Sequence, residues 1–128
     1  MTQEKHLFEY AVIRVVPMVE REEFINVGII IYSKQQKFLQ CLYHLDKERL
    51  KALSTAIDIN EVEDHLKSFE RICKGSTDGG PIAKLDIASR FRWLTAIRSS
   101  AIQTSRPHSG YCEDLDKTIQ RLFEELVL

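Results

Sequence analysis

Three segments in the first third of the chain are rich in β-branched and aromatic residues, and they constrain the fold more than any other feature. They span residues 7–16, 24–32 and 37–44, and the first of them ends at Pro17. This composition is typical of β-strands. Only the polar residues 33–36 separate the second segment from the third, so we expect these two strands to form an antiparallel hairpin.

The rest of the chain carries apolar residues at helical spacing in four places. Asp46 is expected to cap a short helix over about 47–54, and Asp114 is expected to cap the last helix. Asp58 begins a sequence that resembles a capping box, and the amphipathic stripe behind it predicts a longer helix. The fourth helix, which lies before the last one in the chain, is expected over 84–97.

The connecting segments complete the predicted architecture. Residues 18–23 are expected to form a turn or one helical turn, and 106–112 a loop. Weak alternation over 99–105 indicates a fourth strand at the edge of the sheet. We therefore expect an α+β fold, a small antiparallel sheet of three to four strands packed with three to four helices on at least one face. The 128 residues are expected to form a single domain over 1–128.

The charge balance argues against one large class of function. The chain has 18 Lys and Arg residues against 19 Asp and Glu residues, for a net charge of −1 at pH 7. DNA-binding domains are usually basic, because phosphate contacts dominate their affinity. Nucleic acid is therefore not the favoured partner, although a local basic patch is compatible with this balance.

Cysteine usage and hydropathy indicate a cytoplasmic protein. Cys41, Cys73 and Cys112 form no C-x-x-C pair, so we expect reduced thiols in or near the core rather than a zinc site or a disulfide. No signal-peptide pattern follows the start, and the longest apolar run, 27–32, is too short to cross a membrane. We expect a cytoplasmic location and no membrane association.

The sequence contains no standard catalytic or nucleotide-binding signature. The P-loop, dinucleotide-binding, zinc-protease and nucleophile-elbow patterns are all missing, and the four histidines have no metal-ligand spacing. We expect no metal ion and no cofactor, and a binding protein rather than an enzyme.

Arg14 lies within the first predicted strand, among apolar residues. Strand alternation places it on one face with Phe8, Tyr10, Val12 and Val16. An arginine in this setting must reach solvent, pair with a carboxylate or line a pocket. Two interpretations follow: an ion pair with an acid such as Glu22 or Glu23, or an arginine that binds an anionic ligand.

Asn26 and Gly28 interrupt the aliphatic residues of the second predicted strand. Alternation predicts that these two residues share one face, and that the opposite face is wholly apolar and made by Ile25, Val27, Ile29 and Ile31. Glycine weakens a strand unless another group closely approaches its backbone. A packed helix or a β-bulge would explain Gly28, and so would a ligand beside Asn26.

Segment 84–108 concentrates positive charge and hydrogen-bond donors. It contains five Lys and Arg residues against one acidic residue, a net charge of +4. Arginines and hydroxyls at a helix end and in a loop suit phosphate or carboxylate recognition, and the alternative is a solvated or ion-paired loop. The candidate ligand- or anion-binding residues of the whole chain are therefore Arg14, Asn26, Arg90, Arg98, Ser99, Ser100, Gln103, Arg106 and His108.

Five blocks, in order along nearly the whole chain, resemble a bacterial family. They are Y-x-x-I-R-x-V-P at 10–17, E-F-x-N-V-G-I at 23–29, R-F-x-W-L-T-A-x-R-S-S-x-I-Q at 90–103, H-x-G at 108–110 and an amphipathic block at 115–127. On these blocks the chain resembles the family known as domain of unknown function 3037. The blocks include most of the candidate polar residues, and this favours the interpretation that these residues form a shared polar site.

The resemblance implies a partner more than an activity. Genes of this family often neighbour genes for HipA-type serine/threonine kinases, which implies an accessory protein in a toxin–antitoxin or defence-like system. We therefore expect a protein-interaction module that docks through an exposed apolar patch or an edge strand, with 99–105 as the candidate strand.

Two alternatives remain from the residues themselves. The first is a nucleotide- or nucleic-acid-binding domain that uses an arginine-rich anion site made by Arg14, Arg90, Arg92, Arg98 and Arg106. The second is a hydrolase or nuclease with His108 as general base and with Arg14 and Arg98 as electrostatic stabilisers. The second requires these side chains to converge around a cleft.

Overall fold

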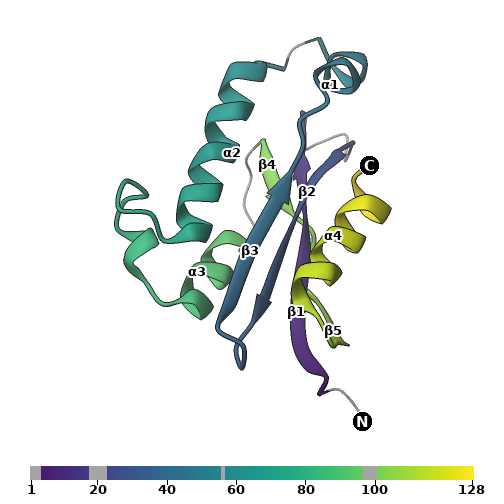
Figure 1. Cartoon of the computed structure of the whole chain (residues 1–128). Helices are drawn as coiled ribbons and strands as arrows, with labels where there is room; N and C mark the ends of the chain where they lie inside the picture. Colours follow the sequence, from purple (N-terminus) through teal and green to yellow (C-terminus); the bar gives the residue numbers. More distant parts are fainter. Residues whose placement is uncertain (1–3, 18–22, 56, 97–100) are drawn as a thin grey trace.

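The computed structural model describes residues 4–17, 23–55, 57–96 and 101–128, which form an antiparallel sheet with helices on both faces (Figure 1). The strands are β1 (His6–Val15), β2 (Ile25–Ser33), β3 (Phe38–Tyr43), β4 (Ile102–Thr104) and β5 (His108–Cys112). The helices are α1 (Lys47–Leu53), α2 (Ile59–Lys74), the 3-10 helix η2 (Ile82–Lys84), α3 (Ile87–Leu94) and α4 (Leu115–Leu126). The α+β prediction is confirmed.

The sheet has five strands rather than the predicted three to four. Strands β3, β2 and β1 lie side by side in that order, and β4 and β5 both pair with the free side of β1. Residues 106–112, predicted as a loop, contain β5. The sequence of β5 is polar and short, so it lacks the apolar alternation that reveals a strand, and its pairing with β1 makes it one.

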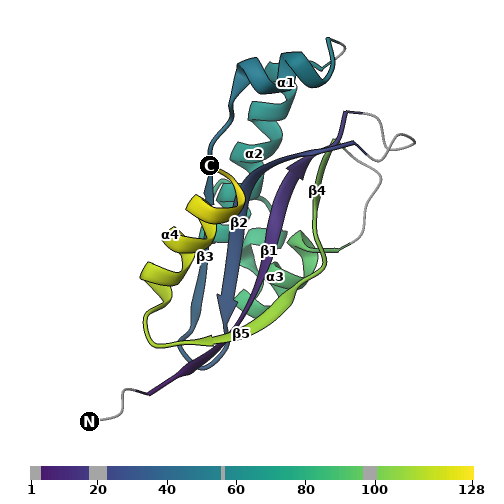
Figure 2. The same cartoon turned by 90° about the vertical axis from the view of Figure 1, so that its right-hand side faces the viewer.

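Strands β4 and β5 follow each other along the same edge of the sheet, as Figure 2 shows. Ser105, which lies between β4 and β5, is also bonded to β1, because its backbone N–H donates to Val12 O at 2.8 Å. The Val12 N–H in turn donates to Ser105 Oγ at 2.9 Å. The edge strand predicted over 99–105 is described only from Ala101 onward, where it comprises Ala101, β4 and Ser105.

Each face of the sheet carries its own hydrophobic core. Helices α1, α2 and α3 cover one face, with Leu50, Leu66 and Phe91 fully buried there. Helix α4 covers the other face through Leu115, Ile119 and Leu122. We call these the α2 face and the α4 face. Burial on both sides explains why β1 and β2 read as nearly continuous apolar runs.

A β-bulge in β2 overturns the prediction that Ile25, Val27, Ile29 and Ile31 form one face. Ile13 pairs with Gly28 while the next residue of β1, Arg14, pairs with Asn26, so Val27 is the additional residue. Ile25 and Val27 therefore pack on the α2 face, whereas Ile29 and Ile31 pack on the α4 face.

The same bulge separates Asn26 from Gly28, which were predicted to share a face. A Cβ atom on Gly28 would lie 2.5 Å from Leu42 O and 3.1 Å from Ile13 Cδ1, a residue of the α2 face. Neighbouring protein atoms therefore account for this glycine, in agreement with the bulge interpretation.

The predicted helix caps are present at the predicted aspartates. Asp46, Asp58 and Asp114 each accept a hydrogen bond from the backbone N–H three residues later. The helix predicted over 84–97 is shorter than expected. It begins at Ile87, because Asp86 accepts from the Ser89 N–H at 2.7 Å and so caps it, and it ends at Leu94.

Candidate functional site

Three of the predicted site residues lie side by side on the α4 face of the sheet. Arg14 of β1 pairs with Asn26 of β2 on one side and with Gln103 of β4 on the other. Directly paired residues on antiparallel strands project from the same face, so their side chains form one line across three strands. We call these three residues the Arg14 row.

Arg14 occupies the centre of this row without a counter-charge from the described residues. Its side chain is half-buried, and its guanidinium carbon lies 4.1 Å from the centre of the Phe24 ring. Its Nε atom is buried and has no hydrogen-bond partner. None of the ion pairs found among the described residues includes Arg14, and its predicted partner Glu22 lies outside those residues. The alternation that placed Arg14 with Phe8 and Val12 is confirmed.

Asn26 connects the Arg14 row with the end of α4. Its Nδ2 atom donates to Leu126 O at 3.1 Å, which fixes the orientation of the amide. Its Oδ1 atom is buried and unpaired. Asn26 also lines a cavity of about 300 Å³, whose polar wall includes His44, Asp46 and Arg49. Within it, Asp46 is committed to capping α1.

His108 lies on the same face as Arg14 but further along β1. It pairs with Tyr10, and the two rings have centroids 5.4 Å apart. Tyr10 is four residues from Arg14, which corresponds to about 13 Å along a strand. His108 and Arg14 therefore do not converge on one point, so this pair lacks the proximity that a joint catalytic role needs.

Arg106 is exposed between the two edge strands, and its carbonyl accepts a hydrogen bond from Ser105 Oγ at 3.1 Å. The remaining candidates Arg98, Ser99 and Ser100 lie outside the described residues. Among the described candidates, the structure thus brings together Arg14, Asn26 and Gln103. It places Arg106 and His108 along the edge of the sheet that β4 and β5 form.

Arg90 stabilises the fold rather than an external ligand. Its Nη1 atom donates to Cys73 O at 2.9 Å and to Ile72 O at 3.2 Å, both in the last turn of α2. Its Nε atom donates to Leu85 O at 3.0 Å. A cation at a helix C-terminus satisfies carbonyls that lack a partner within the helix. We therefore leave Arg90 out of the candidate site.

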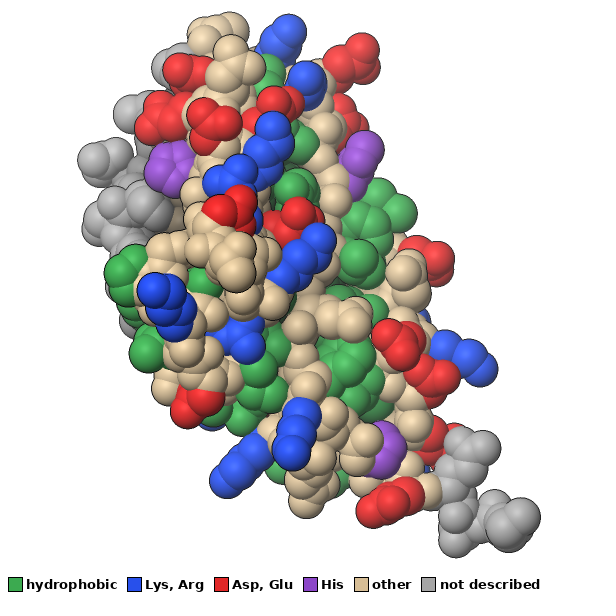
Figure 3. All heavy atoms as spheres, turned by 60° about the vertical axis from the view of Figure 1, so that its left-hand side comes forward, with side chains coloured by type: hydrophobic (Ala, Val, Ile, Leu, Met, Phe, Trp, Pro, Cys, Tyr) green, Lys and Arg blue, Asp and Glu red, His purple; other side chains and the backbone are tan. Residues whose placement is uncertain are grey.

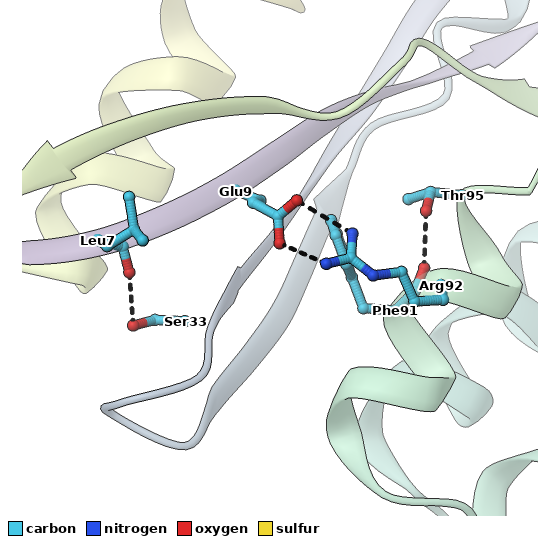
Figure 4. A network of polar contacts seen from close by, with 6 residues as sticks. All are labelled: Leu7, Glu9, Ser33, Phe91, Arg92 and Thr95. Atoms are coloured by element: carbon cyan, nitrogen blue, oxygen red, sulfur yellow. Dashed lines mark hydrogen bonds and ion pairs between the residues drawn. The ribbon is translucent and has the colours of Figure 1, made fainter.

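Arg92 is also engaged within the protein, as Figure 4 shows. It forms a bidentate pair with Glu9 of β1, with Nη–Oε distances of 3.0 and 2.9 Å. These hydrogen bonds raise the pKa of the Arg92 guanidinium. The pair joins α3 to the sheet, so of the five arginines in the predicted anion site, two serve the fold.

The cysteines lie where the sequence predicted. Cys73 is buried, and Cys41 and Cys112 are half-buried. A hydrogen bond to Cys41, together with burial, raises the pKa of the Cys73 thiol. A thiol that stays protonated is a poor nucleophile. In the described part of the chain, no group of three or more His, Cys, Asp or Glu residues is placed to hold a metal ion.

Sequence reasoning missed two features of the site. Phe24, which stacks on Arg14, was expected only as the first residue of a strand, because its contact with Arg14 is set by the pairing of β1 with β2. His44 and Arg49 line the cavity beside Asn26, but they come from the end of β3 and from α1. Only the folded arrangement brings these positions together.

Comparisons with known proteins place the chain in a family. Searches of curated proteins and of solved structures find no match. None of the described helices has the length and apolar character needed to cross a membrane. Residues 10–127 match the family described as "Protein of unknown function (DUF3037)". Since this match covers nearly the whole chain, the protein belongs to the DUF3037 family.

Proposed function

We propose that this chain is a protein-binding accessory module whose docking element is the open edge strand β5. The family resemblance makes a HipA-type serine/threonine kinase the first partner to test, within a toxin–antitoxin or defence-like system. A cytoplasmic location is part of the same proposal.

The observation that carries this proposal is the unprotected outer side of β5. Strand β1 covers its inner side, and no other strand among the described residues pairs with its outer side. Proteins usually protect such edges with lysine, proline or charged side chains, and β5 itself contains none of these. An extended segment of a partner can add to an edge of this kind as a further strand.

The hydrogen-bonding groups that a partner strand would use can be assigned. The N–H and the C=O of Val12 both bond to Ser105, so every second residue of β1 faces this edge. His108 and Gly110 are paired with such residues, Tyr10 and Phe8. The backbone groups of Ser109 and Tyr111 therefore point outward.

Apolar side chains beside this edge would add contact area. Leu7 and Tyr111 are directly paired across β1 and β5, and they are 46% and 70% exposed. They lie on the α2 face, beyond the part that α3 covers. Tyrosine is enriched at protein interfaces because its ring is apolar and its hydroxyl tolerates water.

The test is binding of a HipA-type kinase from the same genome to the wild-type chain and to Ser109→Pro, measured by isothermal titration calorimetry. Proline removes an outward N–H that the fold does not use, so circular dichroism should be unchanged. We expect affinity to fall at least tenfold. In the Tyr111→Ser control, the backbone N–H is retained, so the loss should be smaller.

Two results would count against the proposal in different ways. No complex with wild-type protein would remove the kinase as partner. A complex that tolerates Ser109→Pro would remove β5 as the docking element.

The two alternative functions receive less support from the geometry. An anion site for nucleic acid would draw on Arg90 and Arg92, which are bonded within the fold. Figure 3 displays the face formed by α2 and α3, and acidic and basic side chains are interspersed over its described residues. A hydrolase would need His108 close to Arg14, and these residues are separated along β1.

A further inference from the structure

We propose that the Arg14 row is a binding site for one carboxylate group, which the terminal nitrogens of Arg14 would hold. This site lies on the α4 face, away from the outward groups of β5. It is independent of the edge proposal, and either can fail without the other.

The first argument is the charge of Arg14, which none of the ion pairs among the described residues compensates. The described residues place no carboxylate within ion-pairing distance of its guanidinium, and the buried Nε atom has no hydrogen-bond partner. Withdrawing a cation partly from water without a counter-charge costs stability. A bound carboxylate would supply the missing charge and accept hydrogen bonds from the nitrogens that solvent can reach.

The second argument is that Arg14 is held in place without using its terminal donors. The guanidinium lies 4.1 Å from the centre of the Phe24 ring, a cation–π contact. Packing rather than hydrogen bonding therefore positions the side chain. A group ordered in advance loses less conformational entropy when a ligand binds.

The third argument concerns which anion fits. The neighbours of Arg14 in the row, Asn26 and Gln103, are neutral amides, so the row carries a single positive charge. One guanidinium offers two parallel N–H groups, which match the two oxygens of a carboxylate. Phosphate sites instead gather several cations or a helix N-terminus. The end of α4 at this place is a C-terminus, which presents Leu126 O.

The experiment follows the arginine Nε–Hε resonances of 15N-labelled protein during a titration with sodium acetate at constant ionic strength. Arg14→Lys assigns the Arg14 resonance by its disappearance. We expect acetate to shift the Arg14 resonance with saturation. The resonance of Arg106, which is exposed, should shift no more with acetate than it does in a reference titration with sodium chloride.

Inorganic phosphate serves as the competing probe. A response of Arg14 to phosphate at lower concentration than to acetate would overturn the carboxylate assignment. Equal, non-saturating drift of Arg14 and Arg106 would overturn the site itself.

Two substitutions test the geometry through the side-chain amide resonances of Asn26 and Gln103. Arg14→Lys keeps the charge but loses the fork, so the saturable response to acetate should vanish. Phe24→Leu keeps Arg14 but removes the stacking, and we expect the acetate affinity to fall at least threefold. Phe24 is 46% exposed, so this variant should fold normally. Wild-type acetate affinity in both variants would refute the proposal.

Discussion

Arg90 shows at the residue scale how a charged side chain can stabilise a helix end. It donates to three backbone carbonyls, two of them at the C-terminus of α2. The left-handed Gly75 (φ 68°) ends this helix, and a Cβ there would lie 2.7 Å from Arg90 Nη1. The Arg90 guanidinium and Gly75 thus end helix α2 together, and no short sequence motif predicts this arrangement.

We expect Arg90→Leu to lower the free energy of unfolding by about 2–3 kcal/mol, because carbonyls would lose hydrogen bonds to a charged donor. Urea denaturation measures the change. Arg106→Leu is the control, since this exposed arginine should change stability by no more than about 0.5 kcal/mol. Equal effects of the two substitutions would show that Arg90 does not hold α2.

At the element scale, Asp86 caps α3 and so sets where this helix begins. The stability that this cap contributes should depend on pH. Hydrogen bonds from Ser89 hold the pKa of the Asp86 carboxyl below its ordinary value. A carboxyl with a lowered pKa in the folded state contributes stability above its unfolded pKa. This stability is lost as the pH falls through the folded pKa.

The expected result is a steeper loss of thermal stability in the wild type than in Asp86→Asn below about pH 4, the ordinary range of a carboxyl. Asparagine still caps a helix but does not titrate there. Melting curves at a series of pH values give the comparison. Parallel curves for the two proteins would mean that the charge of Asp86 does not support α3.

The elements also show what could be predicted from the sequence. Apolar runs located β1, β2 and β3, and aspartates located the starts of α1, α2 and α4, because these features are local. The bulge at Val27 and the strand β5 depend on pairing with β1, which has no local signature. The candidate site follows the same rule: the sequence singled out Arg14, Asn26 and Gln103, whereas their position side by side required the register.

At the scale of the whole molecule, one sheet supports two cores. Leu66 of α2 is buried on one face and Leu122 of α4 on the other, and β1 and β2 contribute to both. Neither core can open without exposing apolar residues of the shared strands. The molecule should therefore unfold in a single step.

We expect Leu66→Ala and Leu122→Ala each to cost about 2–5 kcal/mol of stability. Urea transitions followed by Trp93 fluorescence and by far-UV circular dichroism should coincide in the wild type and in both variants. Trp93 lies on α3, so its signal reports the α2 face. A variant in which fluorescence and dichroism separate would show that the two cores unfold independently.

The pairing of β1 with β5 has a consequence for synthesis of the protein. His6 lies opposite Cys112, so β1 completes its pairing on this side only after the chain as far as Cys112 has been made. At about 5–20 residues per second, a ribosome needs roughly 5–20 s to make the intervening chain. For that time the nascent β1 has one unpaired side, and a chaperone that shields it would be most useful before translation reaches α4.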